Sequence, residues 1–177
     1  MYFVLKVAGS ALVTIGSLLA GRKVKMQYKK RCEILKQMQE ALKYADDTIA
    51  IENTLLDNVL RDCGEKFFKR EKGKDVWTCA AENLKTEFGS FENAWDKACN
   101  EFFEDEVCLN EKDKECIRNI GKAIGIANTQ RQTAHVTAGL QRLQTLEKEA
   151  NAAETKEGNN AVKIALAIAA VVIIVLF

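Results

Sequence analysis

The last fourteen residues, Ile164 to Phe177, read IALAIAAVVIIVLF and contain nothing but Ile, Ala, Leu, Val and Phe. A helix of this sequence is apolar on every face, which is typical of a segment in lipid or deep in a core. The residues before it predict an amphipathic helix, because apolar side chains recur at gaps of three and four: Val136, Leu140, Leu143, Leu146 and Ala150. We therefore expect one element to run from a helical domain into a membrane.

A second apolar run covers residues 2–21, and only Lys6, Ser10, Thr14 and Ser17 interrupt it. Twenty helical residues span about 30 Å, the thickness of a bilayer core. A secretory signal would carry its basic residues before such a run. Here six follow it, ahead of the first acid, Glu33: Arg22, Lys23, Lys25, Lys29, Lys30 and Arg31. The positive-inside rule places this flank in the cytoplasm and Met1 outside, and the flank could also contact anionic lipid.

Between the apolar ends the chain favours helices. It contains no proline, whereas average usage would give about nine, and no segment alternates cleanly between apolar and polar residues. We predict an all-α protein: a transmembrane helix at 1–21, a cytoplasmic helical bundle at 22–160 and a second transmembrane helix at 161–177. The second span is short, about 25 Å, and the poor helix formers at 158–160 predict a hinge before it.

Capping signals divide the predicted bundle. Thr54, Ser90, Asn110 and Asn128 each precede an apolar periodic stretch and are expected to be N-caps. Residues 64–73 begin and end with glycine and are expected to form a helix end and a turn. The aromatic residues of the stretch after Ser90 recur at helical spacing and are expected in the core.

The residues give no positive evidence for catalysis or a cofactor. The single histidine, His135, has no nucleophile motif beside it. The six cysteines include no Cys-x-x-Cys pair, so we expect buried free thiols without bound metal. Charge is balanced, with 26 Lys and Arg against 25 Asp and Glu, and we expect no nucleic-acid partner. An acidic segment is either a solubilising surface or a partner-binding patch: Glu101, Glu104, Asp105 and Glu106.

The segment IGKAIG at 120–125, followed by Asn128, Gln132 and a long helix with a hydrophobic tail, resembles the stage III sporulation protein AB family. The first part of the chain fits the same family through Gly9, Gly16 and Gly21, then Tyr28, Arg31 and Leu35. Two positions depart from the family pattern. Asn128 stands where an Asp is usual, and Asn53-Thr54 replaces an expected proline.

The resemblance implies a non-enzymatic membrane component of the secretion-like complex between mother cell and forespore. The family's soluble domain is similar to the inner-membrane platform protein of type II secretion and type IV pilus systems. By that analogy the cytoplasmic domain would dock a secretion-type ATPase, the AA protein of the same complex. The alternative is a membrane-tethered receptor or regulator that binds a small ligand, with Trp77, Phe91 and Trp95 lining the pocket.

Overall fold

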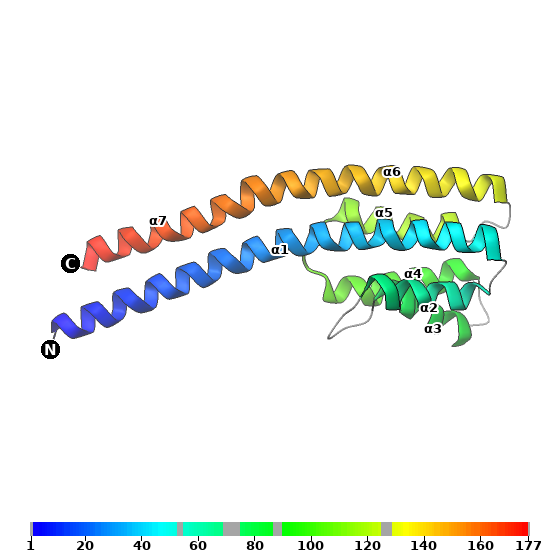
Figure 1. Ribbon diagram of the computed structural model, residues 1–177. Helices are drawn as coiled ribbons and strands as arrows, with labels where there is room; N and C mark the ends of the chain where they lie inside the picture. The colour runs from blue at the N-terminus through cyan, green and yellow to red at the C-terminus, as the bar shows by residue number, and fades with distance from the viewer. Residues whose placement is uncertain (1, 53–54, 69–74, 87–89, 125–128, 177) are drawn as a thin grey trace. The chain divides into compact units, whose positions relative to one another are not determined.

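The computed structural model describes residues 2–52, 55–68, 75–86, 90–124 and 129–176, and every regular element within them is helical. The predicted all-α class is confirmed. The elements are α1 (Tyr2–Glu52), α2 (Leu56–Phe67), α3 (Val76–Thr86), α4 (Phe91–Asp105), α5 (Glu111–Ile124), α6 (Thr129–Ala153), the π-helical segment η1 (Glu154–Gly158) and α7 (Asn159–Leu176) (Figure 1). The predicted caps Thr54 and Asn128 lie outside the described residues.

The chain forms two compact units. The hairpin unit comprises Met1–Cys32 and Lys148–Phe177, and the bundle unit comprises Glu33–Glu147. The bundle unit is therefore shorter at both ends than the predicted domain 22–160.

The core of the bundle unit is built around the second part of α1. Leu35, Met38 and Leu42 are fully buried and recur at helical spacing on one face of the helix. Helix α2 attaches to this face where the Cys63 thiol donates to the Ala41 carbonyl oxygen at 3.5 Å. Helices α2 and α3, α3 and α4, and α4 and α5 then pack in sequence, and Figure 1 shows α2, α3 and α4 grouped together beside α1.

The contact between α4 and α5 depends on a glycine. A Cβ atom at Gly121 would overlap the indole ring of Trp95, so only glycine admits the ring at this position. The Trp95 indole N–H donates to the Ile117 carbonyl oxygen of α5 at 3.0 Å. Trp95 also packs edge-on against Trp77, with 5.0 Å between ring centroids. The predicted IGKAIG motif therefore has a packing role at its glycine.

Polar side chains define where the short helices begin. Ser90 is the N-cap of α4 and its side chain accepts from the Asn93 amide, as predicted. Asn110 and Asp113 form a reciprocal capping box at the start of α5, with distances of 2.9 and 3.0 Å. Both starts were correctly predicted from the sequence.

The helix end predicted within residues 64–73 is confirmed, because α2 ends at Phe67. The turn predicted after it lies in residues 69–74, outside the described part of the chain. Gly64 lies inside α2, which continues to Phe67, and it is buried. A Cβ atom there would meet Thr78 and the Asp75 carboxylate. That carboxylate caps α3 by accepting from the Thr78 amide at 2.8 Å. The glycine is needed because α2 passes close to the start of α3, which the local sequence does not reveal.

In the hairpin unit α1 and α7 pack antiparallel through small residues. A Cβ atom at Gly21 would lie 3.0 Å from the Ala165 Cβ, and Ala165 and Ala169 are buried. One turn further along α1, Lys25 donates to the Asn159 side-chain oxygen at 2.9 Å, and Lys25 also packs on Gly158. Small residues at a helix interface let the two backbones approach closely, as in membrane helix pairs.

The helical connection from α6 to α7 is continuous through η1, so residues 158–160 do not interrupt the helix. The expected hinge is replaced by a π-helical turn, which accommodates an extra residue within a helix. Gly158 is the buried residue of η1. The packing on Lys25 explains why a weak helix former is retained at this position.

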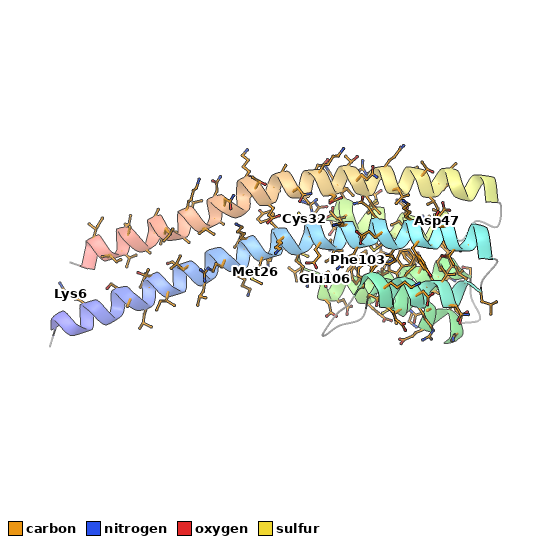
Figure 2. The ribbon with its side chains drawn as sticks, in the orientation of Figure 1. Lys6, Met26, Cys32, Asp47, Phe103 and Glu106 are labelled. Atoms are coloured by element: carbon orange, nitrogen blue, oxygen red, sulfur yellow. The ribbon has the colours of Figure 1, made fainter. Side chains whose placement is uncertain are left out.

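Large apolar side chains project outward from both helices of the hairpin unit. Leu12 is 72% exposed and Ile174 is 76% exposed. Met26 also projects from α1, and Lys6 lies near its N-terminal end (Figure 2). Within the described part of the chain, one helical stretch, Ala134–Ile174, is long and apolar enough to cross a membrane by length and composition. The predicted N-terminal span stays a prediction.

We predict that Gly121→Ala destabilises the protein although alanine favours helix by about 1 kcal/mol. Forcing a methyl group against Trp95 should cost about 1–3 kcal/mol. Gly139→Ala is the matched control in α6, because its Cβ would meet only Leu42 at an ordinary 3.5 Å. Urea unfolding followed by circular dichroism measures both changes. Equal effects of the two substitutions would contradict the packing argument.

We predict that Gly21→Leu separates α1 from α7, since the new side chain has no room against Ala165. The readout is disulfide formation in membranes between cysteines introduced as Lys25→Cys and Asn159→Cys. Gly16→Leu is the control, because nothing lies within 4 Å of a Cβ at that position. The first substitution should remove most of the cross-linked product and the second should retain it.

Candidate partner-binding surfaces

Helix α4 presents an acidic face near its C-terminal end. Glu101, Glu104 and Asp105 are all exposed. Their positions i, i+3 and i+4 place the three carboxylates on one side of the helix. We name these three residues the acidic face. These three are the residues of the predicted acidic patch that are exposed in the structure.

Glu106 does not belong to that face, because only 1% of it is exposed. It is the C-cap residue of α4, and its amide donates to the Phe103 carbonyl oxygen at 3.4 Å, close to Phe103 in Figure 2. Its carboxylate accepts from the Cys108 thiol at 3.6 Å. The sequence does not distinguish the buried Glu106 from the exposed acids before it, because nothing in the run of acids marks the end of α4 between Asp105 and Glu106.

Cations from α5 border α4 on the Phe103 side. The Arg118 guanidinium lies 5.5 Å from the Phe103 ring centroid, and the Lys114 ammonium lies 6.0 Å from it. Arg118 also donates to the Asn100 side-chain oxygen at 2.6 Å. These cations are therefore engaged in contacts between α4 and α5, and they bound the acidic face on that side.

The predicted basic flank lies in the hairpin unit, and its six members differ in environment. Arg22, Lys23, Lys29 and Lys30 are exposed on α1. Lys25 is half-buried and bonded to Asn159, and Arg31 is only 9% exposed. The flank can therefore present four side chains to an anionic surface instead of six.

The two tryptophans of the aromatic cluster lie in the core, and Phe91 is half-buried beside them. Trp77 and Trp95 are 0% and 1% exposed, and Phe91 packs against Trp95 with 5.9 Å between centroids. The Trp77 indole nitrogen is buried without a hydrogen-bond partner among the described residues.

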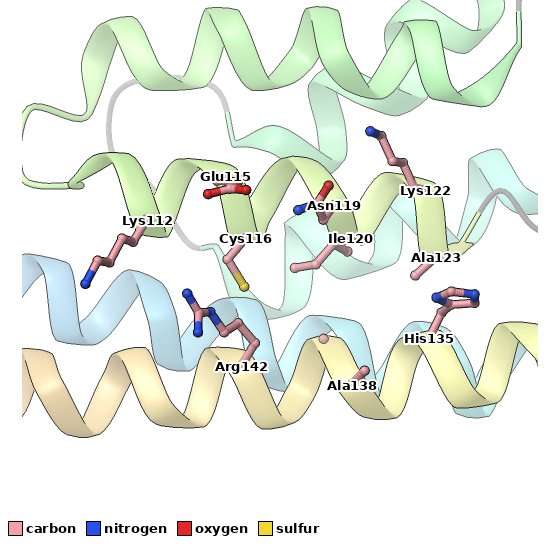
Figure 3. A pocket seen from close by; sticks show the side chains of 11 residues that line it. Lys112, Glu115, Cys116, Asn119, Ile120, Lys122, Ala123, His135, Ala138 and Arg142 are labelled. Atoms are coloured by element: carbon pink, nitrogen blue, oxygen red, sulfur yellow. The ribbon is translucent and has the colours of Figure 1, made fainter.

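A cleft of about 490 Å³ lies instead between α5 and α6 in the bundle unit (Figure 3). Its rim carries Lys112, Lys122, His135 and Arg142, while Ile120, Ala123, Ala138 and Gly139 contribute apolar or small surface. Sequence reasoning missed this cleft and assigned His135 to a helix surface or an interface. The available signal was the adjacent pair Ala138-Gly139 on an otherwise polar helix face.

The cysteines are free, and five of the six are buried, as predicted. Burial raises the pKa of Cys63 and Cys99 to about 12 and that of Cys116 to about 11. These thiols therefore stay protonated near neutral pH and are poor nucleophiles. Among the residues that the structure describes, no three His, Cys, Asp or Glu side chains are grouped to hold a metal ion.

We predict that Cys108, the one half-buried thiol, reacts first with N-ethylmaleimide at pH 8 in the folded chain. The buried thiols should react only after unfolding, because they are both inaccessible and protonated. Mass spectrometry of the labelled peptides gives the order of reaction. Cys108→Ser should remove the fast phase, and a fast phase that survives this substitution would show that another thiol is accessible.

The comparisons with known proteins place this geometry in a family. Residues 6–177 match the stage III sporulation protein AB family. A solved structure of a stage III sporulation protein AB (SpoIIIAB) is similar in fold, with a TM-score of 0.65 and 18% sequence identity over 71% of this chain and 97% of that one. A search of curated proteins finds no match. Because the family match covers nearly the whole sequence, the chain belongs to the stage III sporulation protein AB family.

Proposed function

We propose that this protein is a non-enzymatic membrane component of the sporulation complex between mother cell and forespore, and that its bundle unit docks a secretion-type ATPase. Membership of the sporulation family supports the general role. The observation that carries the docking proposal is the acidic face of Glu101, Glu104 and Asp105, exposed together on one side of α4.

The hairpin unit would act as the membrane anchor. Its outward apolar side chains, including Leu12, Ile168 and Ile174, suit contact with lipid, and its small-residue interface suits a membrane helix pair. The exposed basic residues that follow the first apolar run favour a cytoplasmic bundle unit. The membrane is then the mother-cell membrane around the forespore, as the family resemblance implies.

The acidic face would act mainly on the rate and orientation of encounter. Exposed charges on a rim change association rates and salt dependence more than they change the intrinsic strength of a contact. A basic surface on the ATPase would be attracted over about 8 Å at physiological salt. The bundle unit supplies a rigid support for this face because α4 is fixed to α5 through Trp95 and Gly121.

The receptor alternative loses its proposed binding site. It required an open pocket lined by Trp77, Phe91 and Trp95, and both tryptophans are buried in the core. Among the described residues, the cleft between α5 and α6 is the cavity that a membrane-tethered receptor would use instead. Binding of metabolites by a chain that ignores the ATPase would favour that function.

We predict that reversing the acidic face with Glu101→Lys, Glu104→Lys and Asp105→Lys weakens binding of the full chain to the AA-type ATPase by about tenfold or more at low salt. The control reverses three exposed acids on α1 of the same unit: Glu33→Lys, Glu40→Lys and Asp47→Lys. Surface plasmon resonance with the detergent-solubilised chain measures the affinity of each variant for the ATPase. Circular dichroism checks that each variant is folded.

Two outcomes would count against the proposal at different levels. If the wild-type chain does not bind the ATPase at any salt concentration, the docking function fails. If it binds and the acidic-face variant binds equally well, the function stands but the acidic face is not the docking site.

A further inference from the structure

We propose that the cleft between α5 and α6 binds an acidic, amphipathic helical segment of a second protein. The inference is independent of ATPase docking at the acidic face of α4. It rests on the charge, the spacing and the small residues of the cleft. The cleft lies wholly within the bundle unit.

The cations of the cleft have no bonded partner within the described part of the chain. Within the described residues, no hydrogen bond or ion pair engages the side chains of Lys112, Lys122 or Arg142. Glu115 is the only acid that lines the cleft. Several other lysines of the unit are paired: Lys66 with Asp62, Lys85 with Asp57 and Lys114 with Glu111. The cleft therefore keeps an excess of positive charge available for a partner.

The spacing of the cations favours an elongated occupant. Lys112 and Lys122 are ten residues apart on α5, which corresponds to about 15 Å along a helix. Figure 3 shows Arg142 beside Cys116, toward the Lys112 end, and His135 beside Ala123, toward the Lys122 end. A single phosphate or carboxylate cannot bridge both ends. A helical segment of about ten residues with acids near its two ends can do so.

The middle of the cleft allows a helix to approach closely. Ala138 and Gly139 project little or nothing from α6, and Ile120 and Ala123 of α5 form an apolar base that is 1% and 6% exposed. Small residues at a helix surface let another backbone pack against it, and an apolar stripe of the incoming helix would cover this part of the cleft. The amphipathic character of the partner follows from this arrangement.

The test uses the full chain in sporulating cells, with a photo-cross-linking amino acid in place of Asn119, which lines the cleft. Irradiation should give an adduct with another protein, and mass spectrometry should map it to an acidic amphipathic helix. The charge variant combines Lys112→Glu, Lys122→Glu and Arg142→Glu and should reduce the adduct by about tenfold or more. Its control reverses three lysines outside the cleft: Lys36→Glu, Lys43→Glu and Lys97→Glu.

A charge exchange decides whether the contact is direct. Reversing the acids of the mapped segment to lysine should restore the adduct with the charge variant and weaken it with the wild-type chain. Ala138→Trp fills the cleft without changing its charge and should also remove the adduct. Because Ala138 is exposed, this substitution should leave the fold intact, which circular dichroism verifies.

The other outcomes overturn the proposal. An adduct of small added mass would identify a metabolite site, a lipid adduct would identify a membrane contact, and an adduct between two copies of this chain would identify self-association. A protein adduct that survives both the charge variant and Ala138→Trp would show that the cleft is not the contact. Loss of ATPase binding is not expected in any of these variants, so failure here is distinguishable from failure of docking at α4.

Discussion

The bundle unit depends on the fit of the Trp95 indole into the surface of α5 at Gly121. The ring occupies the space that any Cβ atom would need, and its N–H is satisfied by the Ile117 carbonyl oxygen. Burying an indole without this bond would leave a polar group unpaired, which costs about 1–3 kcal/mol. The same ring packs against Trp77 of α3. The Trp95 side chain of α4 thus contacts both α3 and α5. Its packing therefore helps to position the acidic face on α4 and the cleft beside α5.

In the hairpin unit, glycine and alanine again allow two helices to approach closely. In the membrane that we propose for this unit, lipid would offer no hydrophobic driving force between two apolar helices, so close backbone approach and polar contacts would have to hold them together. Gly21 and Ala165 provide the approach, and Lys25 with Asn159 provides the polar contact. The large apolar side chains are left on the outside, where a membrane would cover them.

Much of this arrangement could be predicted from the sequence because it is local. Helical spacing placed the aromatic residues after Ser90 in the core, where Trp95 and Phe102 are buried, and Ser90 and Asn110 marked helix starts through their side-chain chemistry. What could not be predicted depends on contacts between distant segments. The packing of Asp75 on Gly64 inside α2 has no signal in the local sequence. Glu106 was grouped with exposed acids because the end of α4 between Asp105 and Glu106 has no sequence mark.

The bundle unit carries two surfaces of opposite charge, and this separation has a physical consequence. The acidic face on α4 attracts basic partners and repels acidic ones. The basic cleft between α5 and α6 attracts acidic partners and repels basic ones. If the acidic face and the cleft bind the partners that we propose, each surface also disfavours the partner of the other, and one rigid domain would hold two proteins without competition. Helix α5 contributes to both contacts, through Arg118 and Lys114 toward α4 and through Lys112 and Lys122 toward the cleft. The position of α5, set by Gly121 against Trp95, therefore determines the geometry of both surfaces at once.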